Sequence, residues 1–317
     1  MEIPLRSRYQ GLMLGLAAGD ALGTTVEFSP PGTFEPLTDM VGGGPFELST
    51  GQWTDDTSMA LCLAESLVEC RGFNGCDQMD RYVRWWREGY HSSTGACFDI
   101  GNTVRAALTR FIRTREPFSG SVDPRSAGNG SLMRIGPVPL AYRHDPAQAL
   151  VVASDVSRTT HATIECLDAC RAWTALILAA LAGWSKEDIC TRSWWNLPGF
   201  QAHNELAPSV AAVLRGSYLE RMPPQIRGTG YVVNSLEAAL WAFYRSESFA
   251  EGALLAANLG DDADTTAAIY GQLAGAFYAV EAIPSSWRAK LADHDLILSL
   301  ANQLLQLAEE EAKHGPL

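Results

Sequence analysis

Apolar residues recur at helical spacing along most of the chain, and this periodicity restricts the fold more than any other feature. Within residues 56–70, Met59, Leu63, Leu67 and Cys70 follow one another at intervals of three or four, which draws one apolar stripe along a helix. Convincing alternation of apolar and polar residues, the pattern of a half-buried strand, is absent. The sequence therefore predicts an all-α fold.

Further stretches carry the same spacing, and the breaks between them are also informative. We expect additional helices at residues 162–182, 231–244, 264–280 and 293–313. Residues 29–51 are rich in Pro and Gly and longer than a connector needs, which indicates a functional loop. Other breaks fall at residues 118–130, 195–208 and 222–230. Without a repeat or a clear interdomain linker, we expect residues 1–317 to form one domain, a single orthogonal bundle of roughly a dozen helices.

The charge and the cysteine content exclude several classes of protein. A formal net charge of -12 argues against a nucleic-acid groove or an anionic membrane surface as partner, and it suits a protein that gathers cations. No uninterrupted apolar stretch reaches the roughly 18 residues that a membrane span needs. Seven cysteines without a CxxC pair are poor support for a disulfide framework or a zinc site. We therefore expect reduced thiols and a cytoplasmic protein.

Oxygen ligands are concentrated in three short segments, at residues 19–28, 53–57 and 259–266. Carboxylates and threonine hydroxyls are hard donors that suit Mg²⁺ or Mn²⁺ better than zinc. Helix capping is the alternative, since Thr54 and Asp262 each precede an apolar helix. Capping needs only one or two such residues, however, and these segments supply more.

If the acids of these segments converge, they need compensating charge. The acids in question are Glu27, Asp55, Asp56, Asp262 and Asp264. Unpaired carboxylates held close together would be forced to take up protons. Two divalent cations would nearly cancel their charge. Their convergence is a hypothesis at this level.

Six ordered segments resemble the signature motifs of the ADP-ribosyl-glycohydrolases, the family of the dinitrogenase-reductase-activating glycohydrolase. They are GDALG (19–23, with Glu27), WTDDT (53–57), CFDIGN (97–102), SAGNGSLMR (126–134), GYVVNSL (230–236) and GDDADT (260–265). The resemblance runs from residue 11 to about residue 280, which is most of the chain. It implies an all-α fold with a central dinuclear cleft that holds two Mg²⁺ ions, with Mn²⁺ as the alternative.

The resemblance also implies roles for individual residues. The implied metal ligands are Glu27, Thr54, Asp55, Asp56, Asp262, Asp264 and Thr265. The implied contacts to ADP-ribose are Ser126, Gly128, Asn129, Gly130, His161 and Tyr231. Small residues in such a loop allow backbone N–H groups to approach a diphosphate. Asp261 replaces a glycine of many relatives, and we expect it to lie beside the site without binding metal.

The implied reaction is hydrolysis of the bond between ribose and a modified side chain of a protein. Positive charge builds at the anomeric carbon, and carboxylates with an activated water meet it. We expect Asp55 and Asp56 to serve in metal binding and water activation, and Glu27 as a mobile ligand or acid–base group. Asp99 lies in a segment that resembles the one facing the substrate guanidinium in arginine-specific relatives. A carboxylate suits the planar donors of that group.

Several alternatives stay open at this point. The linkage could be to serine, and Asp99 could cap the helix expected near Asn102. The acidic cluster would also suit another two-metal nucleotide hydrolase, and the family fold includes members without activity. For partners, we expect the ADP-ribose moiety of a modified protein and neither nucleic acid nor membrane. We expect a monomer, with a dimer as the alternative.

Overall fold

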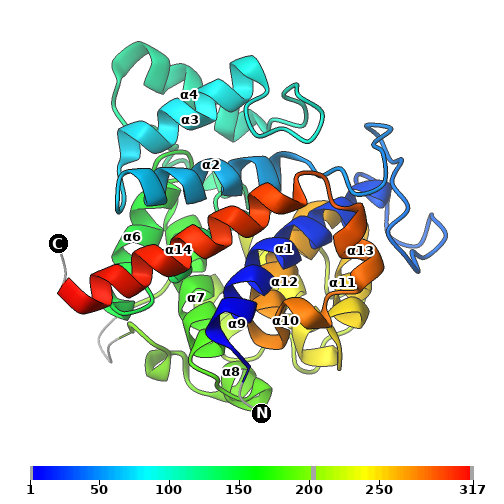
Figure 1. Ribbon diagram of the computed structural model, residues 1–317. Coiled ribbons are helices and arrows are strands. Elements are labelled where there is room, and N and C mark those ends of the chain that lie inside the picture. The colour runs from blue at the N-terminus through cyan, green and yellow to red at the C-terminus, as the bar shows by residue number, and fades with distance from the viewer. Residues whose placement is uncertain (1–2, 201–204, 315–317) are drawn as a thin grey trace.

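The computed structural model describes residues 3–200 and 205–314, and helices are the regular secondary structure of these residues (Figure 1). The α-helices are α1 (Leu5–Gly23), α2 (Asp55–Glu69), α3 (Gly75–Glu88), α4 (Asn102–Thr114), α5 (Pro137–Ala141), α6 (Pro146–Arg158), α7 (Ile164–Leu181), α8 (Lys186–Thr191), α9 (Pro208–Leu214), α10 (Val232–Arg245), α11 (Phe249–Ala257), α12 (Ala263–Tyr278), α13 (Ser285–Lys290) and α14 (His294–His314). Short 3₁₀ turns lie at Thr24–Val26, Pro124–Ser126, Trp194–Asn196 and Val280–Ala282. Extended pairing among the described residues is confined to isolated bridges. The predicted all-α fold is confirmed.

The helices that the apolar spacing predicts are all present, as α2, α7, α10, α12 and α14, and each end falls within two residues of the expected position. Local chemistry sets several of the starts. The Thr163 side chain accepts a hydrogen bond from the Cys166 amide at the start of α7, and Ser248 does the same for Glu251 at the start of α11. Periodicity and caps are both local properties, and therefore sequence alone located these helices.

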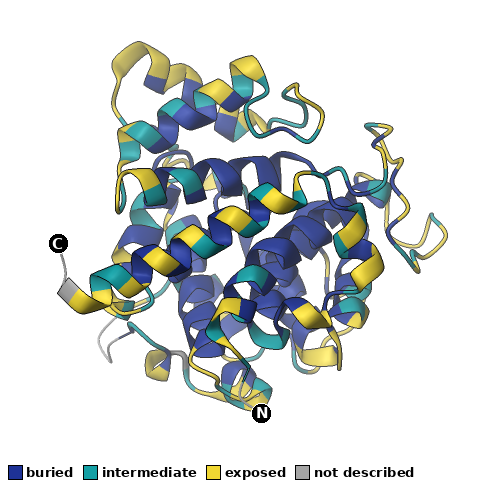
Figure 2. Cartoon of the chain, viewed as in Figure 1, coloured by how far each residue is buried: buried dark blue, intermediate teal, exposed yellow. Residues whose placement is uncertain are grey.

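Helices α1 and α12 lie side by side in the centre of the molecule and are buried along most of their length (Figures 1 and 2). Small residues recur at every fourth position of both: Gly11, Gly15, Gly19 and Gly23 face Gly275, Gly271, Ala267 and Ala263. A Cβ atom added at Gly19 would lie 2.0 Å from the Ala267 carbonyl oxygen. The two backbones are thus in direct contact, which holds the end of α1 against the start of α12.

The main hydrophobic core draws on helices from α1 to α14, and Leu16, Ala60 and Ala268 form a second, small cluster. Helix α7 runs through it and buries most of its circumference, as its Ala- and Leu-rich sequence predicts. Among the described residues, no helix combines the length and apolarity needed to cross a membrane. A single domain over residues 1–317 stays our interpretation of this core.

The long segment between α1 and α2 carries no helix over residues 29–51, as expected. Gly43 and Leu48 pair through their backbones at 2.7 and 3.0 Å, which closes a tight turn around Phe46. The Phe46 ring packs against Phe98 at 5.2 Å and Phe28 at 6.2 Å between centroids. The loop therefore packs an aromatic side chain against the segments that carry Glu27 and Asp99.

Candidate active site

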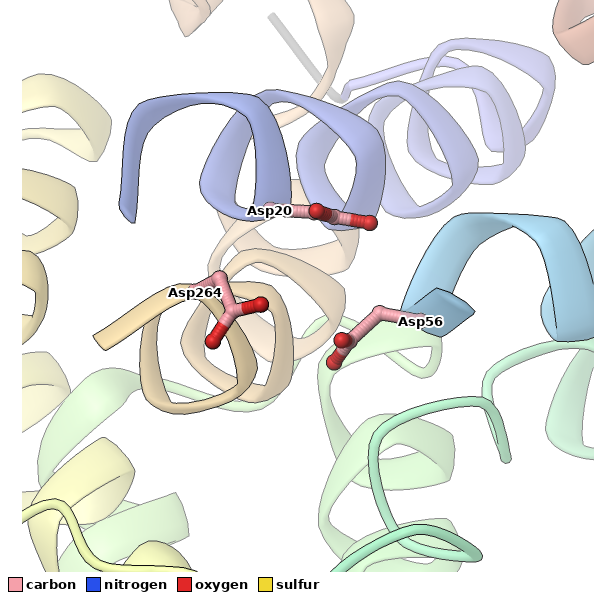
Figure 3. Close-up of side chains that lie close together, drawn as sticks. All are labelled: Asp20, Asp56 and Asp264. Atoms are coloured by element: carbon pink, nitrogen blue, oxygen red, sulfur yellow. The ribbon is translucent and has the colours of Figure 1, made fainter. Parts of the chain in front are cut away.

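Acidic side chains from three helix ends converge beside the contact of α1 and α12. Asp20 comes from the last turns of α1, Asp56 from the first turn of α2 and Asp264 from the first turn of α12, and all three face a common space (Figure 3). One carboxylate oxygen from each lies within 4.8 Å of the others. Glu27, Asp262 and Asp264 form a second group of the same kind. Asp264 belongs to both groups, so the acids form one continuous cluster.

The charge of this cluster is not balanced by the protein. Among the described residues, no Lys, Arg or His forms an ion pair with Asp20, Glu27, Asp56 or Asp264. Burial is the main cause that raises the pKa of Asp56, and the charges of Asp20 and Asp264 add to it. Burial followed by the charge of Asp264 raises the pKa of Glu27 in the same way. The folded chain therefore needs protons or cations at these groups.

Unpaired oxygen atoms provide a test of whether a metal fits. Glu27 Oε2 and Asp56 Oδ1 are buried and form no hydrogen bond with any described residue. The Thr54 hydroxyl lies 2.9 Å from Asp20, 3.3 Å from Asp56 and 3.1 Å from Asp264, and its single proton can serve only one of them. Buried polar atoms without partners are rare unless a ligand completes them. This set of hard oxygen donors fits divalent cations such as Mg²⁺ or Mn²⁺.

Sequence reasoning assigned no role to Asp20, and the structure gives it one. Its carboxylate accepts four hydrogen bonds, from the amide and hydroxyl of Thr54 at 2.8 and 2.9 Å and from those of Thr57 at 3.0 and 2.6 Å. These bonds fix the first turn of α2 against α1 and leave Asp56 directed at the cluster. The sequence signal that could have revealed this role is an acidic residue between Gly19 and Gly23 of an otherwise apolar helix.

Helix capping does not explain the acidic segments. Thr54 and Asp262 occupy the N-cap positions of α2 and α12, yet neither side chain accepts a capping hydrogen bond. Gly101, not Asp99, is the N-cap of α4. The capping interpretation of Thr54, Asp99 and Asp262 therefore finds no support in the geometry.

A cavity of about 380 Å³ opens beside the acids. The predicted site residues on its walls are Glu27, Asp55, Asp99, Gly128, Asn129, Gly130, His161, Asp262 and Thr265. The Asn129 side-chain amide donates a 2.6 Å hydrogen bond to Asp262, which joins the glycine-rich loop to the acidic cluster. Thr54, Asp56 and Asp264 belong to the same cluster but do not line the cavity.

Two predicted substrate contacts, Ser126 and Tyr231, do not line the cavity. The Ser126 hydroxyl donates to the Asp123 carbonyl oxygen at 2.6 Å, within a 3₁₀ turn. Tyr231 is 38% exposed, and its hydroxyl donates to Glu165 at 2.6 Å. Its backbone pairs with Gly128, which keeps it near the loop. Their contact with ADP-ribose stays a prediction.

The glycine-rich loop packs closely on His161. A Cβ atom on Gly130 would lie 2.8 Å from His161 Cε1, so a larger residue would force the loop or the ring to move. The Gly128 and Asn129 amides already donate to the carbonyl oxygens of Ser126 and Gly230. The loop thus offers a ligand fewer free N–H groups than its composition suggests.

Asp99 and Phe28 adopt left-handed backbone conformations at the edge of the cavity, with φ of 55° and 60°. Such strain in residues with a Cβ is typical of functional sites. Burial, then the charge of Asp262, raises the pKa of Asp99 to about 7. Phe28 is 62% exposed, and its amide bonds to the carbonyl of Asp261 at 2.7 Å. The Asp261 side chain forms an ion pair with Arg227 at 2.6 Å.

Comparison with known proteins gives this helical fold and acidic cavity a class. The family model described as ADP-ribosylglycohydrolase matches residues 1–314, and the chain therefore belongs to the ADP-ribosylglycohydrolase family. ADP-ribosylarginine hydrolase Tri1 of Pseudomonas putida (strain GB-1) is 43% identical over 96% of this chain and 79% of its own length. The ADP-ribosyl-[dinitrogen reductase] glycohydrolase of Rhodospirillum rubrum is 31% identical over 90% of this chain and 91% of its own.

The fold comparison agrees with the sequence comparison. A solved structure titled "ADP-ribosylglycohydrolase-related protein complex" superimposes with a TM-score of 0.85 and 43% identity, and the match covers 96% of this chain and 99% of that one. A second Tri1 relative, from Serratia proteamaculans (strain 568), is 40% identical over 95% of this chain and 80% of its own length. The expected family resemblance is confirmed.

Proposed function

We propose that this chain is a metal-dependent hydrolase that removes ADP-ribose from modified arginine side chains of proteins. The observation that carries the proposal is a cluster of buried, uncompensated carboxylates beside a cavity that also contains Asp99 and the Gly128–Gly130 loop. The relatives named as ADP-ribosylarginine hydrolases support the choice of arginine.

We assign the metal site to the predicted oxygen donors. They are Glu27, Thr54, Asp55, Asp56, Asp262, Asp264 and Thr265, and two Mg²⁺ ions are the expected occupants, with Mn²⁺ as the alternative. When bound, such cations would supply Lewis acidity and positive charge to the cavity. The unpaired oxygens of Glu27 and Asp56 support this assignment.

The chain's own carboxylates act on the developing charge. Cleavage of the bond to ribose builds positive charge at the anomeric carbon, and a nearby carboxylate stabilises it. Asp55 lines the cavity whereas Asp56 does not, so we assign the stabilising role to Asp55 and a purely ligating role to Asp56. Glu27 also lines the cavity, where its carboxyl group is placed to take up or release a proton during cleavage.

Asp99 is our candidate for recognition of the arginine. A guanidinium offers a planar fork of donors and a fixed positive charge, which a carboxylate at the cavity wall accepts. The charge of a guanidinium would also relieve the repulsion between Asp99 and its acidic neighbours. A seryl linkage needs neither property. Serine-linked ADP-ribose is therefore the second candidate substrate.

The test is incubation of the chain with ADP-ribosylated arginine and serine peptides, with and without Mg²⁺, followed by mass analysis. Release of free ADP-ribose from the arginine peptide, abolished by excess EDTA, is the expected result. AMP or phosphate as product would instead identify a phosphoester hydrolase. Metal binding without any turnover would indicate a silent family member, and cleavage of the serine peptide alone would overturn the choice of arginine.

We extend the proposal to the state of the protein in the cell. The expected partner is an ADP-ribosylated protein, as the names of the relatives suggest. We propose a cytoplasmic monomer, with a dimer as the alternative. The described cysteines are free thiols, which is compatible with a reducing compartment.

A further inference from the structure

Arg134 is a fully buried cation with no carboxylate partner. Its exposed fraction is 0%, and no described acidic residue lies within ion-pair distance of it. It donates to the Gly130 carbonyl oxygen at 2.6 Å and to the Thr160 hydroxyl at 2.6 Å, and its guanidinium lies 4.7 Å from the centroid of the Tyr82 ring. A buried charge held by neutral acceptors is unusual. Its two shortest hydrogen bonds go to Gly130, on the wall of the cavity, and to Thr160, next to His161.

The contacts of Thr160 fix the direction of its hydroxyl. A guanidinium can only donate, so the Thr160 oxygen must accept from Arg134. The remaining contact of that hydroxyl is with His161 Nδ1 at 2.9 Å. The hydroxyl proton therefore points to Nδ1. The opposite arrangement would leave a fully buried hydroxyl proton without an acceptor among the described residues.

A His161 ring that accepts at Nδ1 carries its own proton on Nε2. Burial and the nearby Arg134 lower the pKa of His161 to about 3, so the ring is neutral at physiological pH. The backbone around it is held firmly, because the His161 amide donates to Ser157 O at 2.7 Å and the Ser157 hydroxyl donates to His161 O at 2.8 Å. Nε2 faces the glycine-rich loop, 3.2 Å from where a Cβ atom of Gly130 would lie.

We infer that Arg134 and Thr160 are positioning residues that hold His161 as an Nε2–H donor toward the ADP-ribose bound in the cavity. This inference rests on the proposed function for the identity of the ligand. The His161 ring would then place a neutral N–H donor on the cavity wall. Such a donor matters there because the Gly128 and Asn129 amides already donate to carbonyl oxygens of the protein. The expected acceptor is an anionic diphosphate oxygen. An N–H donor whose direction is already fixed by the fold stabilises such a charge without reorganising on binding.

The first test reads the tautomer directly. Long-range ¹H–¹⁵N correlation spectra of the ¹⁵N-labelled full chain, without ligand, should show His161 as the neutral Nε2–H tautomer at all pH values from about 5 to 8. The His161→Gln variant assigns the signal. Thr160→Val should convert the pattern to a mixture of tautomers, and Thr160→Ser should restore the Nε2–H form. An Nδ1–H or doubly protonated ring in the wild type would overturn the inference.

The second test measures ligand binding. Calorimetric titration with ADP-ribose in Mg²⁺ should give a Kd about tenfold weaker for Thr160→Val and within about twofold of wild type for Thr160→Ser. In turnover assays Thr160→Val should raise KM and leave kcat nearly unchanged, because the bond is made in both the ground and the transition state. Thr160→Val binding ADP-ribose like wild type would refute the inference.

Thr159 provides a matched control. It is also fully buried, and its hydroxyl donates to Val156 O at 2.7 Å and accepts from Gln78 at 3.1 Å, away from His161. Thr159→Val should lower the melting temperature but change neither the tautomer nor the Kd. A wild type that bound no ADP-ribose would refute the proposed function and the ligand part of this inference, while the tautomer spectra would still decide the roles of Arg134 and Thr160.

Discussion

Replacement of Gly19 by alanine should weaken metal binding as well as folding. The new Cβ atom would lie 2.0 Å from the Ala267 carbonyl oxygen, whereas Cβ contacts under 3.0 Å essentially never occur. Helices α1 and α12 must therefore separate locally by about 1 Å, an overpacking change that typically costs about 1–3 kcal/mol. The better helix propensity of alanine returns up to about 1 kcal/mol of this. A drop of several degrees in melting temperature is expected.

The same separation moves two acids apart. Asp20 follows Gly19 directly on α1, and Asp264 lies one turn before Ala267 on α12. Mg²⁺ requires oxygen ligands at about 2.0–2.1 Å in near-octahedral geometry. Loss of the contacts that hold metal ligands in place typically reduces metal affinity by about tenfold or more. Titration calorimetry of the EDTA-stripped chain with Mg²⁺ and Mn²⁺ measures this loss, and thermal unfolding in EDTA measures the stability.

Gly11→Ala separates the two effects. Its Cβ atom would lie 2.3 Å from the Gly275 carbonyl oxygen, so the clash is similar, but it falls nine residues before Asp20. We expect a similar loss of stability with metal affinity within about twofold of wild type. If Gly19→Ala bound Mg²⁺ as tightly as wild type, or if Gly11→Ala lost as much affinity, the proposed link between helix contact and metal site would be wrong.

Four further predictions concern the acids and the cavity. Asp56→Asn should abolish turnover and weaken Mg²⁺ binding while raising the melting temperature in EDTA, because it removes a carboxyl group whose ionisation is opposed by burial and by the charges of Asp20 and Asp264; an unchanged melting temperature in EDTA would contradict this. Gly130→Val should remove the stabilisation by ADP-ribose in thermal shift assays, since its Cβ atom meets His161 at 2.8 Å. Asp99→Ala should slow cleavage of ADP-ribosyl-arginine by about tenfold or more with little change in ADP-ribose affinity; equal losses of both would exclude specific recognition. Folding raises the pKa of Asp99 from 3.8 to about 7, so protonation of Asp99 stabilises the metal-free fold at low pH. This contribution should be lost as the pH rises from about 4 through 7. Melting temperatures measured in EDTA across that range, with Asp99→Asn as control, test this prediction.

The features that could be predicted from the sequence are those encoded by patterns within one short segment. Helix positions followed from apolar spacing, and the density of oxygen donors around Thr54 and Asp262 indicated a metal site, because both signals lie within one short segment. The four-residue repeat of glycine from Gly11 to Gly23 was equally visible. It could not be interpreted, since sequence does not tell which helix a small face meets.

The features that sequence reasoning missed depend on contacts between distant segments. Asp20 accepts hydrogen bonds from Thr54 and Thr57, which lie 34 and 37 residues further along the sequence, and Arg134 donates to Thr160, 26 residues further along. The hydrogen bond from the Tyr231 hydroxyl to Glu165 joins residues 66 positions apart, and the contact of Tyr231 with ADP-ribose stays a prediction. Such pairings are properties of the assembled fold, which no single segment encodes.

The uncompensated carboxylates have a consequence for how the chain takes up metal. Burial raises the pKa values of Asp55, Asp56 and Asp264, and the charges of neighbouring carboxylates add to this, so the metal-free cluster binds protons more tightly than free carboxylates do. Carboxylate ligands bind metal in their deprotonated form, so binding of a divalent cation there would release protons. We therefore expect metal binding at this cluster to be coupled to proton release. Loading with Mg²⁺ in weakly buffered solution should acidify the medium, and metal affinity should increase steadily with pH.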